Sequence, residues 1–172
     1  MDLKKFIRDV PDFPKPGILF KDITTLLKSP PAFEKTIDEM VENIKKLDID
    51  VSAIAGIESR GFIFGSVIAY KMSLPFILIR KKGKLPAETY SETYELEYGN
   101  DTIEIHKDSI SKDDNFVIVD DLLATGGTAS AATSLIEKNG GNVALLLFLI
   151  ELDELKGRQK LKNKNIKSLI HY

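Results

Sequence analysis

Several residue types that commonly build protein sites are scarce or absent in this chain. Its 172 residues include no Cys and only two His, at positions 106 and 171. The lack of thiols excludes disulfides and thiolate metal sites, and two widely separated His do not favour a His-based metal site. No apolar run reaches the roughly 20 residues that a membrane-spanning helix needs, and the first residues lack the apolar core of a secretory signal. We therefore expect a cytoplasmic protein with no membrane partner.

An excess of charge of one sign is also missing. The 24 basic and 26 acidic residues leave a net charge of −2. A surface without a positive excess does not attract nucleic acid in general, so nucleic acid is not an expected partner. Hydrophobic residues make up 43% of the chain, which is enough for one substantial core. A chain of this length most often forms a single domain, and we expect one over residues 1–172.

Apolar periodicity predicts helices and strands that alternate along most of the chain. Helices are expected over residues 32–47, 61–72, 129–139 and 154–161, and strands over 51–57, 76–80, 116–119, 143–150 and 166–170. Residues 93–98 and 102–106 alternate about Gly-Asn-Asp, as a β-hairpin does. This order indicates an α/β fold with a mostly parallel sheet flanked by helices on both faces. The hairpin would be an appendage at the active-site end.

The most informative stretch is Phe-Val-Ile-Val-Asp-Asp-Leu-Leu-Ala-Thr-Gly-Gly-Thr, residues 116–128. A short buried strand is expected to end at Asp120 and Asp121, and ligands of α/β sheets bind beyond such strand ends. Carboxylates there suit vicinal ribose hydroxyls or a bound cation. A common strand-turn-helix with an Asp near the helix start is the alternative interpretation. It explains one Asp and one Gly, but not two adjacent carboxylates followed by Thr-Gly-Gly-Thr.

The turn after these carboxylates has the composition of a phosphate-binding loop. Glycine tolerates positive φ and lets a ligand approach backbone N–H groups, and the helix that follows adds its positive N-terminal end. Threonine hydroxyls supply further donors. The candidate phosphate-binding residues are Ala124, Thr125, Gly126, Gly127 and Thr128.

A second strand-turn-helix junction follows residue 57 and contains Glu58, Ser59 and Arg60. Arg60 beside free backbone N–H groups could hold a second anion such as pyrophosphate. Alternatively, Glu58 and Ser59 cap a helix and Arg60 is solvated. Two anion sites on neighbouring strand ends would match a ligand with phosphates at both ends.

Residues 80–86, Arg-Lys-Lys-Gly-Lys-Leu-Pro, lie between a strand and the predicted hairpin. A charge run of this kind is usually a solvated loop. Here its position and its lack of periodicity up to about residue 91 favour a lid that closes over reacting groups, with cations that stabilise a departing pyrophosphate. In the hairpin itself, alternation places Glu97 on the face opposite Tyr94, and spacing alone leaves Glu97 facing solvent.

Six motifs occur together and in order, and together they resemble the adenine phosphoribosyltransferases over essentially the whole chain. They are Pro-Asp-Phe-Pro-x-Pro-Gly from residue 11, Glu-Ser-Arg-Gly-Phe, Arg-Lys-x-Gly-Lys-Leu-Pro, Leu-Glu-Tyr-Gly, the Asp-Asp loop and Leu-Lys-Gly-Arg at residues 155–158. The resemblance implies a type I phosphoribosyltransferase-like fold, with a hood over about residues 1–30 and a lid loop and hairpin over about 81–107. It also implies purine salvage, in which adenine and 5-phosphoribosyl-1-pyrophosphate (PRPP) give AMP and pyrophosphate with Mg²⁺, in a homodimer.

The resemblance assigns roles that spacing does not. Asp120 and Asp121 would hold ribose hydroxyls, residues 124–128 the 5′-phosphate, and residues 58–60 pyrophosphate. Glu97 would handle the proton at adenine N7. No residue is assigned as a direct metal ligand, because Mg²⁺ would be held through PRPP and water. The other implied contacts are Lys84 from the lid, Arg80 toward a neighbouring subunit, and Leu19, Phe20 and Lys21 around adenine.

Position 21 departs from the family, since many relatives carry Arg where this chain has Lys. Lysine offers a point charge without the planar guanidinium fork, so the hood geometry is expected to differ if this side chain orders it. Two other functions remain open at this stage. One is a transferase for an oxopurine such as xanthine, and the other is a PRPP-sensing regulator without turnover.

Overall fold

The structure is a computed structural model that describes residues 1–95 and 99–172, which form two compact units, residues 1–39 and 40–172. In the first unit, β1 and β2 pair antiparallel as a hairpin. Its elements are η1 (Leu3–Phe6), β1 (Arg8–Pro11), β2 (Leu19–Asp22), α1 (Thr24–Leu27) and the beginning of α2 (Pro30–Lys45). Residues 8–22 form no helix, as their three prolines predict.

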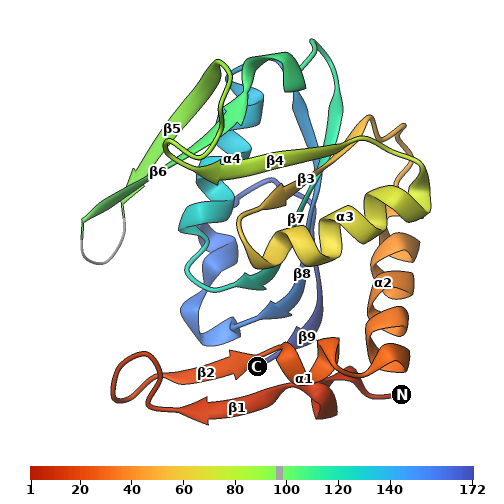
Figure 1. Cartoon of the computed structure of the whole chain (residues 1–172), viewed down its shortest axis with the longest axis vertical. Helices are drawn as coiled ribbons and strands as arrows, with labels where there is room; N and C mark the ends of the chain where they lie inside the picture. The colour runs from red at the N-terminus through yellow and green to blue at the C-terminus, as the bar shows by residue number, and fades with distance from the viewer. Residues whose placement is uncertain (96–98) are drawn as a thin grey trace. The chain divides into compact units, whose positions relative to one another are not determined.

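In the described part of the second unit, seven strands form one sheet in the order β5-β6-β4-β3-β7-β8-β9 (Figure 1). Neighbours from β4 through β3, β7 and β8 to β9 are parallel, whereas β6 pairs antiparallel with both β4 and β5. The predicted mostly parallel sheet with an antiparallel hairpin is therefore confirmed. The strands are β3 (Ala53–Ile57), β4 (Phe76–Lys81), β5 (Thr89–Glu95), β6 (Asn100–His106), β7 (Asn115–Leu123), β8 (Asn142–Glu151) and β9 (Ile166–His171).

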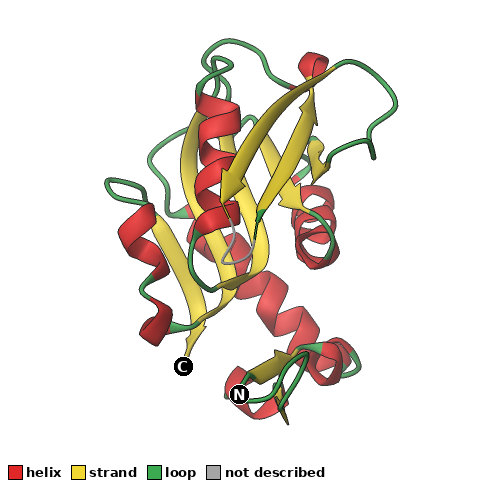
Figure 2. Ribbon diagram, turned by 90° about the vertical axis from the view of Figure 1, so that its left-hand side faces the viewer, coloured by secondary structure: helices red, strands yellow, loops and turns green. Residues whose placement is uncertain are grey.

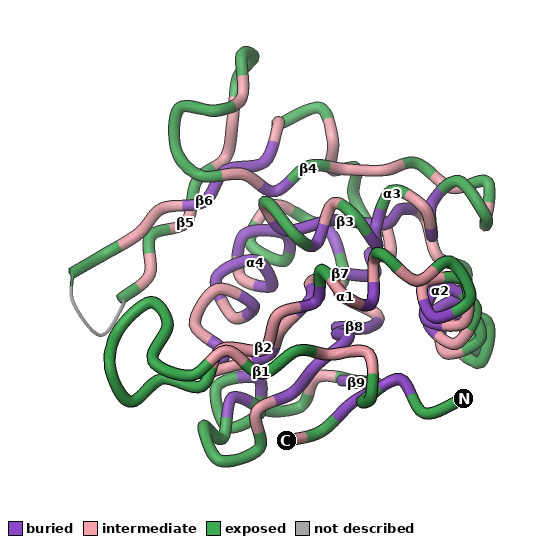
Figure 3. The backbone as a smooth tube through the Cα atoms, turned by 60° about the horizontal axis from the view of Figure 1, so that its bottom comes forward, coloured by how far each residue is buried: buried purple, intermediate pink, exposed green. Residues whose placement is uncertain are grey.

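Helices cover both faces of this sheet (Figure 2). On one face, α4 (Gly127–Glu137) buries its apolar side against alternate residues of the central strands, in a core that includes Ala55, Ile118 and Phe148. On the other face, α3 (Arg60–Met72) begins so close to β7 that a Cβ on Gly61 would lie 2.6 Å from the carbonyl oxygen of Val119. The central strands are accordingly buried along most of their length (Figure 3).

Three sequence predictions about the elements are wrong. The hairpin strand predicted from residue 93 already begins at Thr89, which pairs with His106 of β6. The strand predicted for residues 116–119 continues to Leu123, because β8 still pairs with it there and opposes Leu123 with Glu151. On its other side, the pairing of β7 with β3 ends at Val119. Asp120 and Asp121 thus lie inside a strand, but beyond the end of its neighbour β3.

The helix predicted for residues 154–161 is instead a pair of 3₁₀ turns, η3 (Asp153–Leu155) and η4 (Gly157–Lys160). They are separated by Lys156, whose φ of +52° is left-handed. Glycine at position 157 further weakens a continuous helix. Another 3₁₀ turn, η2 (Lys107–Ser109), follows β6. Within residues 1–95 and 99–172, no helix combines the length and apolarity needed to cross a bilayer.

Candidate functional site

A cavity of about 450 Å³ opens where β3, β4 and β7 end and where α3 and α4 begin. Backbone ends and charged side chains meet here because parallel strands present their carboxyl ends at one edge of the sheet. The residues that line it are Ile57, Glu58, Ser59, Arg60, Ile79, Lys81, Tyr94, Asp101, Ile103, Asp120, Asp121 and Thr128.

The cavity brings together six of the residues that the sequence singles out: Glu58, Ser59, Arg60, Asp120, Asp121 and Thr128. Five others, Arg80, Ala124, Thr125, Gly126 and Gly127, are neighbours in sequence of lining residues but are not among them. Lys84 does not line the cavity either, and its carbonyl oxygen accepts a hydrogen bond from Arg80. Leu19, Phe20 and Lys21 belong to the other compact unit, and Glu97 lies outside the described residues.

The turn from β3 to α3 joins the two predicted anion sites directly. Arg60 Nε donates to Asp121 Oδ2 at 2.5 Å, and the Asp121 side chain is nearly buried while that of Arg60 is 44% exposed. The alternative that Arg60 is merely solvated is therefore wrong. Ser59 sits at the N-cap of α3 but makes no side-chain capping hydrogen bond, which leaves its hydroxyl available to the cavity.

Asp120 has the most strongly perturbed carboxyl group of the described residues. Burial raises the pKa of Asp120 well above its usual range, and the adjacent Asp121 carboxylate raises it further. The Asp121 N–H donates to Asp120 Oδ1 at 2.9 Å and opposes this shift only in part. A ligand that brings hydroxyl donors or a cation to this carboxyl group would stabilise its ionised form.

The Thr-Gly-Gly-Thr loop leads into α4 with the geometry that its glycines predict. Gly126 is the N-cap of α4 and has a φ of +79°, and Gly127 and Thr128 form the first turn. The backbone N–H groups at the start of this 11-residue helix have no partner within the helix, so this end favours an anion. The Thr128 hydroxyl lines the cavity and donates to the Tyr94 hydroxyl at 3.2 Å.

Two polar lining residues, Tyr94 and Asp101, were not predicted as part of the site, and Lys81 was predicted only as one of the cations of the lid. Lys81 Nζ lies 3.1 Å from Asp101 Oδ2, and the Tyr94 hydroxyl donates to the same oxygen at 3.5 Å. The hydrogen bond and charge of Asp101 raise the pKa of Lys81, and burial raises that of Tyr94. The alternation in β5 placed Tyr94 on an inward face, but nothing local in the sequence brings Asp101 beside Lys81, because that contact depends on β4 pairing with β6.

The base of the predicted lid is fixed by Arg80 and Glu58. Arg80 Nε donates to Glu58 Oε2 at 2.9 Å, and an Arg80 terminal nitrogen donates to the Lys84 carbonyl oxygen at 3.3 Å. The Lys81 backbone N–H donates to the same Glu58 oxygen at 3.1 Å. Glu58 therefore connects the turn before α3 to the lid residues of its own chain.

The β5–β6 hairpin is attached to α4 at both ends of the helix. At the first turn, Thr128 meets Tyr94, and near the last turn Glu92 accepts hydrogen bonds from Lys138 Nζ at 2.7 and 2.9 Å and from Ser134 at 3.1 Å. These contacts hold α4, which follows the phosphate loop, and the hairpin together as one rigid unit.

In the first unit, the predicted base-binding residues lie on β2. Lys21 opposes Asp9 of β1 in register, and its Nζ lies 2.7 Å from Asp9 Oδ1. The ring of Phe20 packs edge-on against Phe13 at a centroid distance of 5.2 Å, and the Leu19 side chain is 49% exposed. Lysine at position 21 therefore forms an ion pair within the hood hairpin, where an arginine would offer a guanidinium fork.

The residues that line the cavity suit a polyanion that also carries hydroxyl groups. Helix N-termini and the cations Arg60 and Lys81 favour phosphate groups, while the carboxylates accept hydroxyl protons. Both cations are paired with carboxylates, so a phosphate ligand would compete with these carboxylates for them.

Comparisons with known proteins agree with this description. Residues 24–170 match the model of the phosphoribosyl transferase domain. The chain is 54% identical to an adenine phosphoribosyltransferase of Koribacter versatilis over 99% of this chain and 92% of that one. Among solved structures, adenine phosphoribosyltransferase from Thermoanaerobacter pseudethanolicus is 50% identical and superposes with a TM-score of 0.94 over 99% of this chain and 98% of that one. The enzyme from Saccharomyces cerevisiae, complexed with an imino-altritol bisphosphate and adenine, is 42% identical, with a TM-score of 0.91 over 97% and 96% of the two chains.

Proposed function

The chain belongs to the adenine phosphoribosyltransferase family, and from that premise we propose how its residues carry out the reaction. The protein is a transferase of purine salvage that converts adenine and PRPP to AMP and pyrophosphate. The observation that supports the division of roles is the cavity in which the Asp120–Asp121 pair lies between the α4 loop and the Arg60 turn.

The α4 loop, residues 124–128, takes the 5′-phosphate of PRPP. Its N–H groups and the Thr128 hydroxyl are donors, and the helix N-terminus lowers the energy of the negative charge. Asp120 and Asp121 accept hydrogen bonds from the ribose hydroxyls. The ribose is then fixed between its phosphate and the pyrophosphate, which supplies much of the acceleration by positioning.

Pyrophosphate binds at residues 58–60 and requires an exchange of partners. Arg60 leaves Asp121 and turns to the pyrophosphate, and Asp121 gains ribose hydroxyl donors in its place. Lys84 and Arg80 add cationic charge as pyrophosphate departs from ribose C1. The Arg80–Glu58 contact within one chain supports a role at the lid base, and any reach of Arg80 to a neighbouring subunit is part of the proposal.

Adenine binds to the hood residues. The ring stacks on Phe20, the Leu19 backbone contacts its Watson–Crick edge, and the Lys21–Asp9 pair holds the strand that presents them. Adenine N9 attacks C1 on the face opposite pyrophosphate, with inversion. Glu97 manages the proton at N7.

Substituting Glu97 with Gln should leave PRPP binding nearly unchanged and lower turnover. General acid–base groups contribute about 10²–10⁴-fold, so kcat is expected to fall within this range. Steady-state kinetics together with PRPP titration of the same protein measure both quantities. Glu95→Gln, two residues away, is the matched control. A Glu97→Gln enzyme with unchanged kcat would remove Glu97 from the mechanism.

Mg²⁺ fits the residues of this cavity. It prefers oxygen ligands and usually keeps several waters beside substrate phosphates, so PRPP would hold the ion and Asp120 and Asp121 would contact it through water. When bound, the ion supplies positive charge that neutralises the phosphate oxygens. A second group of potential ligands, Glu151, Asp153 and His171, fits less well, because both carboxylate oxygens of Glu151 already accept hydrogen bonds from Arg158 and Ser168.

A homodimer is part of the proposal and is supported by exposed apolar side chains on α3 and β4. Tyr70, Leu78 and Ile63 are 87%, 37% and 36% exposed. Leu78 shares a sheet face with Phe76, which packs on Gly65 of α3, so helix and strand contribute to one side of the molecule. Apolar surface of this kind is typical of protein interfaces.

The double variant Ile63→Asp with Tyr70→Asp should therefore dissociate the homodimer. Burying charge without a partner in an interface is unfavourable. Sedimentation should shift from twice 19.2 kDa to 19.2 kDa. Ile49→Asp, at a 44% exposed apolar position in the loop before β3, is the control. A variant that keeps the wild-type mass would place the interface elsewhere.

A cytoplasmic location completes the proposal. PRPP carries several charges and does not cross a bilayer unaided, because moving charge into hydrocarbon is costly. Its consumer should therefore be in the compartment where PRPP is made. Fractionation of cells that express the tagged protein tests this location.

Pyrophosphate release from PRPP and Mg²⁺, measured in parallel with adenine, hypoxanthine, guanine and xanthine, tests the function. Strong turnover with adenine alone is expected. Turnover with an oxopurine would keep the phosphate sites and overturn the base assignment. PRPP binding without turnover of any base would indicate a regulator.

A further inference from the structure

The Leu-Lys-Gly-Arg motif, residues 155–158, is far in sequence from the phosphate loop but touches it. A Cβ on Gly126 would collide with the carbonyl oxygen of Gly157, and a Cβ on Gly157 would collide with that of Ala124. The two backbones are therefore in direct contact, which only glycine at both positions permits. Gly157 is buried at the start of η4, directly beneath the loop that leads into α4.

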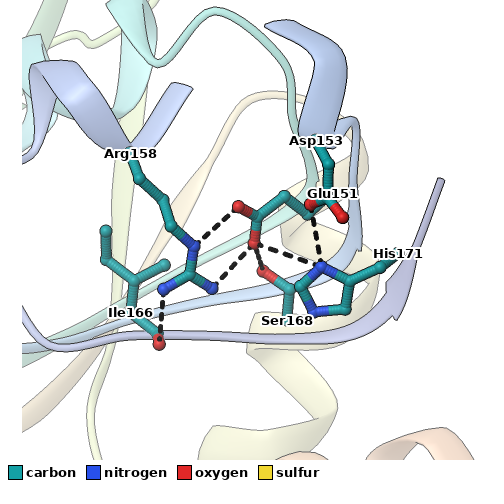
Figure 4. A network of polar contacts seen from close by, with 6 residues as sticks. All are labelled: Glu151, Asp153, Arg158, Ile166, Ser168 and His171. Atoms are coloured by element: carbon teal, nitrogen blue, oxygen red, sulfur yellow. Dashed lines mark hydrogen bonds and ion pairs between the residues drawn. The ribbon is translucent and has the colours of Figure 1, made fainter. Parts of the chain in front are cut away.

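Arg158 holds this turn in place through a bidentate ion pair with Glu151 (Figure 4). Its Nε and a terminal nitrogen lie 2.6 and 2.8 Å from the two carboxylate oxygens. Its other terminal nitrogen donates to the Ile166 carbonyl oxygen on β9 at 3.4 Å. A planar fork that binds both oxygens fixes orientation as well as distance.

Glu151 is itself fixed to the strand that ends in the phosphate loop. It opposes Leu123 of β7 in register, and the Leu152 N–H donates to the Leu123 carbonyl oxygen at 3.0 Å. Ser168 donates to Glu151 Oε2 at 2.7 Å. The Glu151 side chain is 5% exposed, and although burial raises its pKa, hydrogen bonds from Arg158 and Ser168 outweigh this and lower it. Glu151 is thus ionised and held in place, and it pairs with Leu123, the residue directly before the loop.

A continuous chain of contacts therefore links β7 to its own loop. Leu123 pairs with Glu151, which binds Arg158. Gly157, next to Arg158, contacts the loop backbone at Ala124 and Gly126. We propose that Arg158 is a positioning residue for substrate binding, which acts through Gly157 to hold the 124–128 backbone in the shape that receives the 5′-phosphate. The proposal rests on the assignment of the 5′-phosphate to this loop. It gives the Leu-Lys-Gly-Arg motif a function, although none of its residues lines the cavity.

Arg158→Gln and Arg158→Lys test the proposal, with Lys164→Gln as the control. Lys164 is in the segment after η4, and its ion pair with Glu137 reaches the far end of α4 and not the loop. For each variant we would measure kcat, the KM values for PRPP and adenine, and the binding of AMP and of pyrophosphate alone. Circular dichroism at the assay temperature establishes that each variant is folded.

Arg158→Gln is expected to raise the KM for PRPP about tenfold or more, because a shift of the loop by a fraction of an ångström weakens every contact to the phosphate. AMP binding should weaken by a similar factor. Binding of pyrophosphate alone and the KM for adenine should stay within about twofold of wild type, since their residues are elsewhere. Arg158→Lys, which restores the charge without the fork, should lie in between.

A role of Arg158 in overall stability alone would give a different pattern. It would lower kcat through the folded fraction and leave both KM values unchanged, or weaken AMP and pyrophosphate alike. Either result overturns the proposal, as does a Lys164→Gln variant that weakens AMP binding as much as Arg158→Gln. Failure of the wild-type protein to use adenine and PRPP would instead overturn the assigned function.

Discussion

The double variant Asp120→Asn with Asp121→Asn should lose PRPP affinity by at least about a hundredfold, since each hydrogen bond to a charged group contributes about 1.5–3 kcal/mol. Asn retains an acceptor oxygen but loses the charge that favours ribose hydroxyls and Mg²⁺. Both carboxylates line the cavity and come from β7, so the double variant removes the charged hydrogen-bond acceptors on that side of the cavity. Titration calorimetry with PRPP and Mg²⁺ measures the effect.

Pyrophosphate alone is the internal control for this variant. Asp121→Asn removes the ion-pair partner of Arg60, so Arg60 is easier to recruit and pyrophosphate binding should not weaken. Retained PRPP affinity in the double variant would mean that the carboxylates do not contact the ribose. Parallel loss of pyrophosphate binding would mean that the turn at residues 58–60 has been disturbed.

The single variant Asp120→Asn should also make the ligand-free protein more stable at neutral pH. Burial and the Asp121 carboxylate raise the pKa of Asp120, so the folded state favours the protonated form. The stability that this group contributes is present below its unfolded pKa of about 3.9 and is lost as pH rises through the higher folded pKa. Asn does not titrate and keeps this stability.

Thermal unfolding as a function of pH tests this sign. The melting temperature of Asp120→Asn should exceed that of wild type at pH 7, and the difference should shrink as the pH is lowered toward 4. A wild-type protein that is more stable than the variant at pH 7 would show that Asp120 is stabilised as a carboxylate. Glu34→Gln, on the exposed side of α2, is a control for the loss of one negative charge.

The second large effect is expected for Gly126→Ala. Its φ of +79° is unfavourable for alanine, and the added Cβ would collide with the carbonyl oxygen of Gly157. Backbone cannot move aside as a flexible side chain can, so the loop itself must shift. Activity should fall by about two orders of magnitude, because an ångström of misplacement at a positioned group costs about this much.

Gly140→Ala separates the collision from the conformational strain. Gly140 has a φ of +98°, but its nearest neighbour would be Lys112 Cα at 3.8 Å, which is ordinary contact. Both variants incur the strain of a left-handed alanine, about 1 kcal/mol, and only in Gly126→Ala does the new Cβ collide with a backbone atom. Comparable activity of the two variants would show that the loop tolerates displacement.

The site could be predicted where its chemistry is local in sequence. Asp120, Asp121 and Thr128 were found because a strand, a turn and a helix start follow one another within one short segment, and Arg60 was found in the same way. The sheet was predictable because buried strands and amphipathic helices have distinct apolar periods.

The remaining features depend on pairing between distant segments. Asp101 approaches Lys81 only because β6 lies beside β4, and no spacing in the sequence encodes this contact. The extension of β7 to Leu123 depends on β8 continuing beside it, whereas an Asp-Asp pair in isolation is typical of a strand end. Arg158 pairs with Glu151 across residues 153–160, which form two 3₁₀ turns where apolar periodicity predicts a helix. Residues 96–98 lie outside the described chain, so the role of Glu97 stays a prediction.

The attachment of the β5–β6 hairpin to α4 has a consequence for local unfolding. β5 is an edge strand, and edge strands ordinarily fray and exchange their amide protons early. Here, opening β5 would require breaking both the Thr128–Tyr94 bond and the ion pair of Glu92 with Lys138. The amide protons of β5 and α4 should therefore exchange as one cooperative unit, so that β5 opens only when α4 opens as well.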